Sequence, residues 1–366
     1  MTDHDSLQIP PVFQRATYWY FLPPELIAQE PSPERDASRL LVLRRTTGEI
    51  LLGNFRDLPD LLEPSDLLVF NETKVVPAAL EGRKTTGGRV DLLILDPAER
   101  HPASTTKSTA RTCLVRSSKP IHPATTLTLT SGDGTKLFVE QVIAKGRVMM
   151  RFPVSEENFL AFLLAHGQPP LPPYIKPENR ESSRDVTRYQ TVYARKPGSI
   201  AAPTAGLHFT PEVLHRIQAK GVETTHIVLH VGPGTFVPVR ENDIRRHRME
   251  SEFFQIDPDA AASITRALQE KRRIIAVGTT TVRALESGIR SSLRIAAMAG
   301  RTNLFIFPGF EFRVVGGLIT NFHLPGSTLL MLVAAFAGTK QVLRAYETAI
   351  SQGFRFYSYG DACFII

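Results

Sequence analysis

GSIAAPTAGLHFTPEVLHRIQAKGVETTHIVLHVGPGTF, residues 198–236, is the stretch that decides the fold, because it predicts a small-residue loop, a helix and a strand in succession. The helix begins at Thr210, whose hydroxyl can cap it, and carries a proline and an acid in its first turn. Apolar residues then alternate through Ile227, Leu229 and Val231 with the period of a strand that ends in a Gly-Pro-Gly turn. Open α/β sheets bind ligands beyond the carboxyl ends of their strands, so this stretch predicts the wall of a ligand pocket.

Strand and helix patterns also occur on both sides of this stretch. Short apolar runs predict strands at 40–43, 67–70, 273–278 and 304–307. Helices are predicted at 258–271, 282–289, 328–337 and 340–351, with Asp257 and Ser327 as caps and a turn at 279–281.

The middle of the chain has a different pattern. From about 75 to 152, short β-type runs are separated by glycine turns and show little helical periodicity. We therefore expect an α/β domain formed by both ends of the chain, 1–74 and 153–366, with an antiparallel β-barrel inserted at 75–152. Within the barrel, the Ser/Thr/Ala-rich stretch 99–111 is expected to be a mobile loop.

Composition restricts the class of protein. The 366 residues are 42% hydrophobic, which is ordinary for a soluble globular protein, and the net charge of +7 fits a polyanionic partner or a small-molecule enzyme equally well. The two cysteines, Cys113 and Cys363, favour a reducing compartment and argue against a cysteine zinc site. The acidic N-terminal stretch does not resemble a signal peptide, and the longest apolar run, 329–337, is too short to span a bilayer. We expect a cytoplasmic protein.

Three histidines are candidate acid–base groups: His208 in a Gly/Ala/Thr loop, His230 at a strand end and His323 in a Thr-Asn-Phe-His run. A single histidine of this kind is more often structural, but the three together favour a functional interpretation. Their spacing does not match a metal-ligand pattern, so no metal is expected. The turn at 232–235 is a weak match to a nucleotide- or AdoMet-binding loop, and a tight turn without a ligand explains it equally well.

Seven ordered blocks resemble the S-adenosylmethionine:tRNA ribosyltransferase-isomerase family of queuosine biosynthesis. The blocks are LLVFNETKV at 67–75, RYQTVYA at 188–194, AAPTAGLHFT at 201–210, LHVGPGTF at 229–236, AVGTT at 276–280, TNFHLP at 320–325 and YSYGD at 357–361. The resemblance extends from about Phe21 to the C-terminus.

This resemblance implies a monomeric two-domain enzyme. Such an enzyme transfers the ribosyl part of AdoMet to the aminomethyl group of 7-aminomethyl-7-deazaguanine at the tRNA wobble position. It isomerises that part to an epoxycyclopentanediol, which gives epoxyqueuosine-tRNA with adenine and methionine released. AdoMet is then a consumed co-substrate, and neither a cofactor nor a metal is expected.

The matching blocks supply the candidate site residues. The reaction needs a base beside the sulfonium, a donor for departing adenine and a neutral amine as nucleophile. The catalytic candidates are the titratable residues His208, His230, His323 and Asp361. Candidates for holding AdoMet or tRNA are Asn71, Thr73, Lys74, Arg188, Gln190, Thr204, Gly206, Gly232, Gly234, Thr235, Thr279, Thr280, Arg283 and Asn321.

Five positions depart from the pattern associated with the family: Glu72, Ala79, Glu250, Gly316 and Cys363. The changes at Ala79 and Glu250 exchange charge or imidazole near expected substrate surfaces, and therefore bear on tRNA affinity or rate more than on the fold. Two alternatives stay open, an AdoMet-dependent RNA methyltransferase and a non-catalytic tRNA-binding relative.

Overall fold

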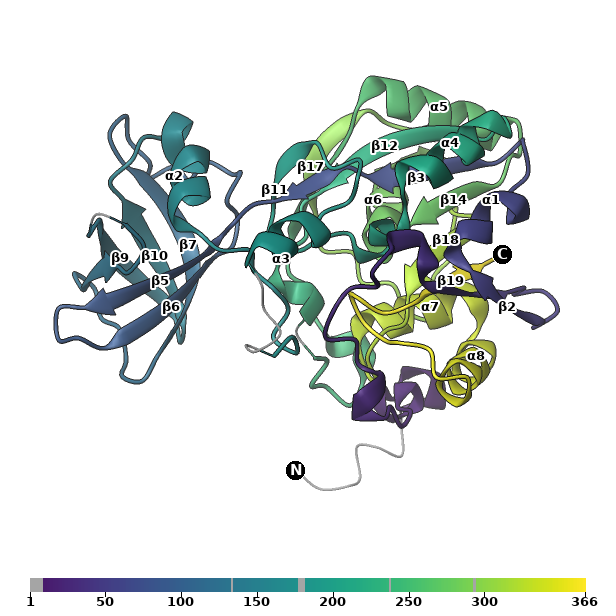
Figure 1. Ribbon diagram of the computed structural model, residues 1–366, viewed down its shortest axis with the longest axis horizontal. Coiled ribbons are helices and arrows are strands. Elements are labelled where there is room, and N and C mark those ends of the chain that lie inside the picture. The colour runs from purple at the N-terminus through teal and green to yellow at the C-terminus, as the bar shows by residue number, and fades with distance from the viewer. Residues whose placement is uncertain (1–8, 133, 177–181, 237, 292–293) are drawn as a thin grey trace.

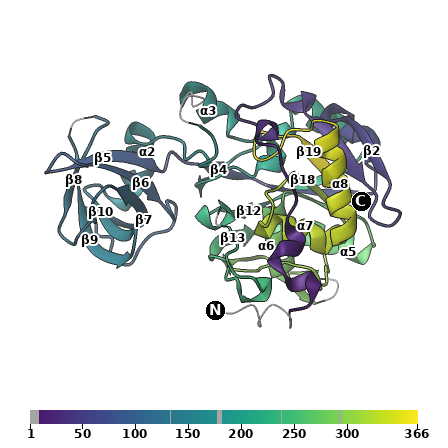
Figure 2. The same cartoon turned by 90° about the horizontal axis from the view of Figure 1, so that it is seen from below.

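The computed structural model describes residues 9–132, 134–176, 182–236, 238–291 and 294–366, with no side-chain description at 182, 183, 235, 236, 290 and 291. A large α/β domain lies beside a small β-barrel, and strands β11 (Figure 1) and β4 (Figure 2) lead from one toward the other. The predicted fold class is confirmed.

The α/β domain is built on a nine-stranded mixed sheet in the order β17-β13-β12-β3-β14-β18-β19-β1-β2. Its strands are β1 (Arg39–Leu43), β2 (Ile50–Asn54), β3 (Leu67–Asn71), β12 (Glu223–Leu229), β13 (Glu252–Ile256), β14 (Ile274–Val277), β17 (Met298–Thr302), β18 (Gly317–Asn321) and β19 (Ala362–Ile365). The four adjacent strands β12, β3, β14 and β18 run parallel to one another, whereas β13 and β19 on either side of them are antiparallel. Because β12 and β14 lie on opposite sides of β3, the strand order reverses there, and such a reversal opens a crevice at the carboxyl ends.

Alternation along the strands gives the sheet two buried faces. In β3, Leu67 and Val69 belong to one core, while Leu68 and Phe70 belong to the other. The first core is closed by α5 (Pro258–Gln269), α6 (Thr279–Gly288), α7 (Thr328–Ala337) and α8 (Thr339–Ser351), and the second by α1 (Leu58–Leu61) and α4 (Pro211–Ala219). Figure 2 shows α7 and α8 together on the side opposite the barrel.

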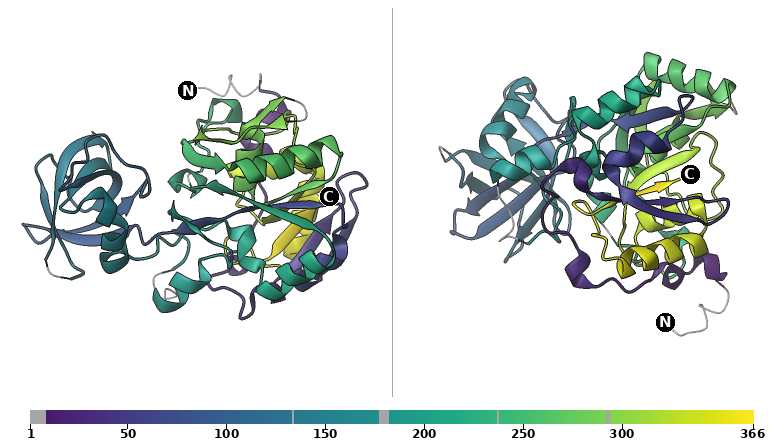
Figure 3. Two further views of the ribbon diagram at one scale, coloured as in Figure 1. Left: turned by 90° about the horizontal axis from the view of Figure 1, so that it is seen from above. Right: turned by 45° about the vertical axis from the view of Figure 1, so that its right-hand side comes forward.

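The inserted unit is a closed barrel in the order β10-β7-β6-β5-β8-β9. Its strands are β5 (Ala79–Lys84), β6 (Arg89–Ile94), β7 (Thr109–Ser117), β8 (Thr126–Leu129), β9 (Lys136–Ala144) and β10 (Arg147–Phe152). Helix α2 (Phe159–His166) packs on this barrel through Phe159 and Leu163, and Gln168 exchanges backbone hydrogen bonds with Ala79. We therefore propose that the inserted unit extends to about Gln168, beyond the boundary at 152 expected from the sequence. Figure 3 shows α2 seated on the barrel in two further views.

The remaining elements connect these parts. They are α3 (Ser182–Arg188), β4 (Thr73–Val75), β11 (Lys196–Ser199), β15 (Ile289–Ser291), β16 (Arg294–Ile295) and short 3-10 turns, including η9 (Thr204–His208) and η10 (Pro233–Phe236). Within the described ranges, no single helix is long and apolar enough to cross a membrane. The pair α7 and α8 meets that test only jointly, by length and composition, and is bent by 114° at Gly338.

Several local predictions were wrong. Residues 304–307 do not form a strand, 279–281 is the first turn of α6 rather than a turn before it, and β7 begins at Thr109 inside the stretch predicted as a loop. Asp257 is the N-cap residue of α5 as predicted, but its side chain makes no capping hydrogen bond, and its carboxylate accepts one from the Gln255 amide.

Candidate active site

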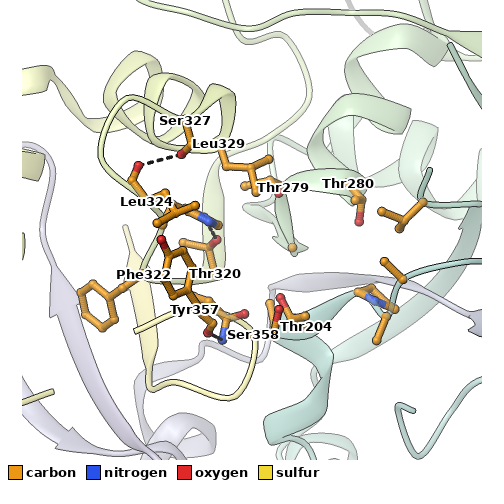
Figure 4. Close-up of a pocket in the computed structure, with 18 of the residues that line it drawn as sticks. Thr204, Thr279, Thr280, Thr320, Phe322, Leu324, Ser327, Leu329, Tyr357 and Ser358 are labelled. Atoms are coloured by element: carbon orange, nitrogen blue, oxygen red, sulfur yellow. Dashed lines mark hydrogen bonds between the residues drawn. The ribbon is translucent and has the colours of Figure 1, made fainter. Parts of the chain in front are cut away.

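A cavity opens at the carboxyl ends of the central strands and encloses about 720 Å³ of empty space, counted out to its open mouth. Its lining combines apolar side chains with a few polar groups, as the lining of small-molecule sites usually does. Figure 4 shows Thr279 and Thr280 from α6 on one side, Tyr357 and Ser358 on another, and Thr204 below. The lining residues are Tyr174, Ala201, Ala202, Pro203, Thr204, Ala205, Val231, Gly278, Thr279, Thr280, Thr320, Asn321, Phe322, His323, Leu324, Ser327, Leu329, Tyr357 and Ser358.

Asn321 is the last residue of β18, and its amide is buried in the wall of this cavity. Its Nδ2 lies 3.2 Å from the Tyr357 carbonyl oxygen and 3.2 Å from His208 Nε2. Its Oδ1 is buried with no hydrogen-bond partner among the described residues. A buried acceptor without a partner is costly, so a ligand that donates a hydrogen bond would stabilise this wall.

The N-terminus of α6 forms another wall. Gly278, with φ +94°, turns the chain from β14 into the helix, and Thr279 and Thr280 follow as its first residues. Asn71, at the end of β3, donates to the Leu229 carbonyl at 2.9 Å and to Thr280 Oγ1 at 3.3 Å. Asn71 thus fixes three elements from behind the wall and does not itself line the cavity. The exposed N–H groups of a helix start favour anionic or oxygen-rich ligand groups.

His323 lines the same cavity and is almost fully buried. Its Nε2 lies 2.7 Å from Thr320 Oγ1, its backbone N–H donates to the Tyr346 hydroxyl, and its carbonyl accepts from the Tyr20 hydroxyl. Burial lowers the pKa of this imidazole from 6.5 to about 3. His323 is therefore a rigidly held neutral imidazole near pH 7.

His208 lies behind the cavity wall, between Asn321 and Ser38. Its Nδ1 is 2.9 Å from Ser38 Oγ, and its ring packs against Phe55 with centroids 5.1 Å apart. Burial, helped by the charges of Arg355 and Arg35, lowers its pKa to about 3. It does not line the cavity, and the geometry gives it the task of orienting the Asn321 amide.

His230 lies on the other side of the strand ends, just after β12. Its Nδ1 is 2.7 Å from the Thr73 hydroxyl and its ring stacks on Phe253, with centroids 5.4 Å apart and planes inclined by 24°. Burial lowers its pKa to about 4, and the carboxylate of Asp96 in the barrel acts in the opposite direction. The sequence grouped His230 with His323, yet the structure places the two in different cavities.

Several candidates lie in contacts internal to the protein. Asp361 accepts hydrogen bonds from the backbone N–H groups of Arg39 and Arg355 and pairs with the Arg39 side chain at 3.3 Å. Arg283 is buried against Glu252 and donates to the Leu304 carbonyl. A Cβ on Gly206 would overlap the Tyr193 hydroxyl, so this glycine serves close packing.

The glycine turn after β12 does not reach the described cavity. Gly232 donates its backbone N–H to Glu252 at 2.7 Å, and Gly234 packs against the side chain of Glu250. Thr235 lies in η10, but its side chain is outside the described part of the structure.

The remaining candidates lie near the linker. Gln190 bonds both the N–H and the carbonyl of Val75 at 2.9 Å, and with the exposed Lys74 it lines a groove between α2 and α3. Arg188 donates to the carbonyls of Ser32 and Pro33. The candidates chosen from the sequence therefore fall into three groups: residues of the cavity wall, residues that support this wall, and residues near the linker.

Sequence reasoning missed Tyr174 and Ser358 as parts of the cavity wall. The Tyr174 hydroxyl donates to Ser358 Oγ, and its ring stacks on Tyr357 with centroids 4.4 Å apart. The YSYGD block contained Ser358, and only its aspartate was selected because it titrates. Nothing in the proline-rich sequence around Tyr174 marks it.

Glu250, one of the five residues that depart from the family pattern, has a structural role. Its Oε1 accepts a hydrogen bond from Arg147 Nη2 of barrel strand β10 at 2.7 Å, so this side chain joins the two domains. Cys363 is buried in β19 opposite Thr320 of β18. Nothing in the structure explains the residue choices at Ala79 and Gly316.

A mixed α/β sheet with a cavity at the carboxyl ends of its parallel strands and an inserted barrel defines a ligand-binding α/β protein. The family model described as queuosine biosynthesis protein matches residues 15–365, and the chain belongs to this family. The prediction made from the seven blocks is confirmed.

Relatives agree over nearly the whole length. The S-adenosylmethionine:tRNA ribosyltransferase-isomerases of Anaeromyxobacter sp. (strain Fw109-5) and Heliobacterium modesticaldum are 51% and 48% identical to this chain, over 94% and 96% of it and 96% and 99% of their own lengths. The crystal structure of S-adenosylmethionine tRNA ribosyltransferase from Thermotoga maritima is 35% identical, with a TM-score of 0.54 over 96% of this chain and 100% of that one. These findings support an enzyme of the transferase and isomerase classes and do not favour the methyltransferase alternative.

Proposed function

We propose that this protein transfers the ribosyl part of AdoMet to the aminomethyl group of 7-aminomethyl-7-deazaguanine at the wobble position of tRNA and isomerises it to an epoxycyclopentanediol. Epoxyqueuosine-tRNA, adenine and methionine are the products. The observation that carries the proposal is the cavity at the carboxyl edge of the sheet, in a chain that belongs to the queuosine biosynthesis family.

AdoMet fits this cavity by its chemistry. The backbone N–H groups at the start of α6 suit its carboxylate, and the hydroxyls of Thr204, Thr279 and Thr280 suit its ribose and amino groups. Asn321 Oδ1 lacks a donor among the described residues, and the ammonium, the ribose hydroxyls and the adenine amino group of AdoMet are all donors.

The reaction breaks the N-glycosidic bond, the C–S bond and one C–O bond of the ribose ring, and forms a C–N bond to the amine, a C–C bond that closes the carbocycle and a C–O bond that closes the epoxide. Two electron pairs leave, one with adenine and one with the methionine sulfur. The amine nitrogen and the carbanion formed by loss of the proton beside the sulfonium supply two pairs in return, and the ring oxygen keeps its own pair for the epoxide. His323 is the base we favour for the proton beside the sulfonium, because it is the one of the four catalytic candidates that lines the described cavity. Asp361, Arg283 and His208 act as positioning residues, since their contacts lie behind the wall.

The partner and setting follow from this reaction. We propose that the protein acts on tRNA as a monomer in the cytoplasm and needs no metal or cofactor. A groove lined by Lys74, Arg35 and Gln190 beside the linker supplies positive charge near the strand ends. The expectation about metal remains a prediction, and within the described ranges no group of three His, Cys, Asp or Glu residues could hold an ion.

The decisive experiment mixes the purified protein with AdoMet and tRNA that bears 7-aminomethyl-7-deazaguanine, and identifies the small products by mass spectrometry. Adenine and methionine together with a modified tRNA are the expected products. S-adenosylhomocysteine would mean methyl transfer, and tRNA binding without any product would mean a non-catalytic relative.

A further inference from the structure

A second cavity lies between the two domains, on the far side of the β12 end from the first. It encloses about 800 Å³ counted out to its mouth and is lined by Leu95, Asp96, Ala98, Glu99, Arg100, Gly198, His230, Val231 and Phe253. The residues from 95 to 100 belong to the barrel loop that follows β6, and the others belong to the α/β domain. Neither domain forms this cavity alone.

The two cavities share part of their wall. Val231 lines both of them, Gly198 lines the second, and Ala201 lines the first. Ser199 fixes this wall, because its Oγ accepts from Val231 N–H at 2.8 Å and donates to the Ala201 carbonyl at 2.7 Å. Two ligands that occupy the two cavities would therefore both contact Val231, just beyond the end of β12.

The second cavity has the chemistry of a nucleobase site. Phe253 and His230 stack on each other and are both partly exposed, so they offer a flat aromatic surface. The same cavity is lined by Asp96, Glu99 and Arg100, and the two carboxylates can accept from the N–H groups of a guanine-type edge. Enzymes that modify bases bind an unstacked base by stacking and by hydrogen bonds to its edge.

We propose that this second cavity is the acceptor site, which takes the aminomethyl-bearing deazaguanine of an unpaired tRNA loop while AdoMet occupies the first cavity. The proposal rests on the proposed function. It gives the barrel a definite task, because the barrel loop 95–100 completes the acceptor site.

Contacts with the α/β domain hold the barrel loop 95–100 in the position that the proposed acceptor site needs. Arg301 of β17 donates to Asp96 Oδ1 at 3.3 Å, pairs with Glu99 and donates to the Ser251 carbonyl at 2.6 Å. At Gly198, a built Cβ would lie 2.5 Å from His230 Nε2 and 2.6 Å from Ala98 Cβ. The barrel loop, the linker and His230 thus meet at Gly198, where any larger residue would clash.

The test fills the cavity from the loop with Ala98→Trp in the full-length protein. Thr86→Trp, in the exposed hairpin between β5 and β6, is the matched control. We expect Ala98→Trp to raise the KM for the aminomethyl-deazaguanine tRNA at least tenfold and to leave the Kd for AdoMet within twofold of wild type. Thr86→Trp should change neither constant.

A second variant, Phe253→Leu, removes the aromatic surface without adding bulk, and stands in if Ala98→Trp does not fold. We expect it to raise the KM for tRNA about tenfold, as the loss of one stacked base would. If both variants keep the wild-type KM for tRNA, or weaken AdoMet binding instead, the acceptor assignment is wrong. Wild-type protein that releases no adenine would refute the proposed function itself.

Discussion

At the scale of single residues, the buried histidines make stability depend on pH. The folded pKa of His208 and of His323 is about 3, below the unfolded value of about 6.5. Between these values the unfolded state binds more protons, so stability falls as pH falls from about 6.5 toward 3. At pH 5 the loss amounts to about 2 kcal/mol for each imidazole.

We therefore predict that His323→Gln flattens this dependence. From pH 7 to pH 5, the free energy of unfolding measured in urea should fall by about 2 kcal/mol more in the wild type than in the variant. His101→Gln, at a surface loop of the barrel, is the control and should keep the full drop. Equal drops in all three proteins would mean that His323 is not held neutral by burial.

The unpartnered oxygen of Asn321 gives a second prediction. Asn321→Ala should weaken AdoMet binding by about 10- to 100-fold, because one hydrogen bond to a buried acceptor is worth about 1–3 kcal/mol. Isothermal titration calorimetry measures the Kd, and thermal unfolding confirms that the variant is folded. Asn303→Ala, at an exposed position, should bind as the wild type does. An unchanged Kd for Asn321→Ala would place AdoMet elsewhere.

Local sequence predicts single residues only where the interaction is itself local. Thr210 and Ser327 cap their helices as predicted, since each hydroxyl accepts from an N–H three residues later at 3.2 Å. His208, Asp361 and Arg283 resembled site residues because their types suit chemistry. Their partners Ser38, Arg39 and Glu252 are distant in sequence, and no local pattern shows that these partners occupy them.

At the scale of elements, η9 is positioned by close packing at Gly206. We predict that Gly206→Ala destabilises the protein by about 1–3 kcal/mol in urea unfolding, because the new methyl group overlaps the Tyr193 hydroxyl. Adding Tyr193→Phe should restore part of the loss, since that hydroxyl has no hydrogen-bond partner within the described residues.

The control for this prediction is Gly88→Ala, where a Cβ would meet only Lys84 Cδ at 3.9 Å. That change should stay within about 0.5 kcal/mol. A Gly206→Ala variant as stable as Gly88→Ala would show that η9 shifts freely.

Elements were predictable where periodicity is strong, as in β3, α7 and α8. The stretch 304–307 is apolar like a strand but pairs with none, and its residues pack on the core instead. β7 was missed because its polar residues find partners only across the barrel, where it lies between β6 and β10. Pairing between distant strands decides such cases, and composition does not reveal it.

At the scale of the whole molecule, two hydrophobic cores on the sheet faces and a third in the barrel predict two unfolding units. Leu92, in β6, is buried in the barrel core, and Leu318, in β18, is buried under the sheet. Each change to alanine should cost about 2–5 kcal/mol. We predict that Leu92→Ala lowers the temperature of only one of two calorimetric transitions and leaves AdoMet affinity intact, whereas Leu318→Ala lowers that of the other and weakens AdoMet binding.

The ion pairs of Arg301 and Arg147 that bridge the domains are partly exposed, and such pairs are worth at most about 1 kcal/mol. One transition that both substitutions shift equally would show instead that the domains unfold as a unit.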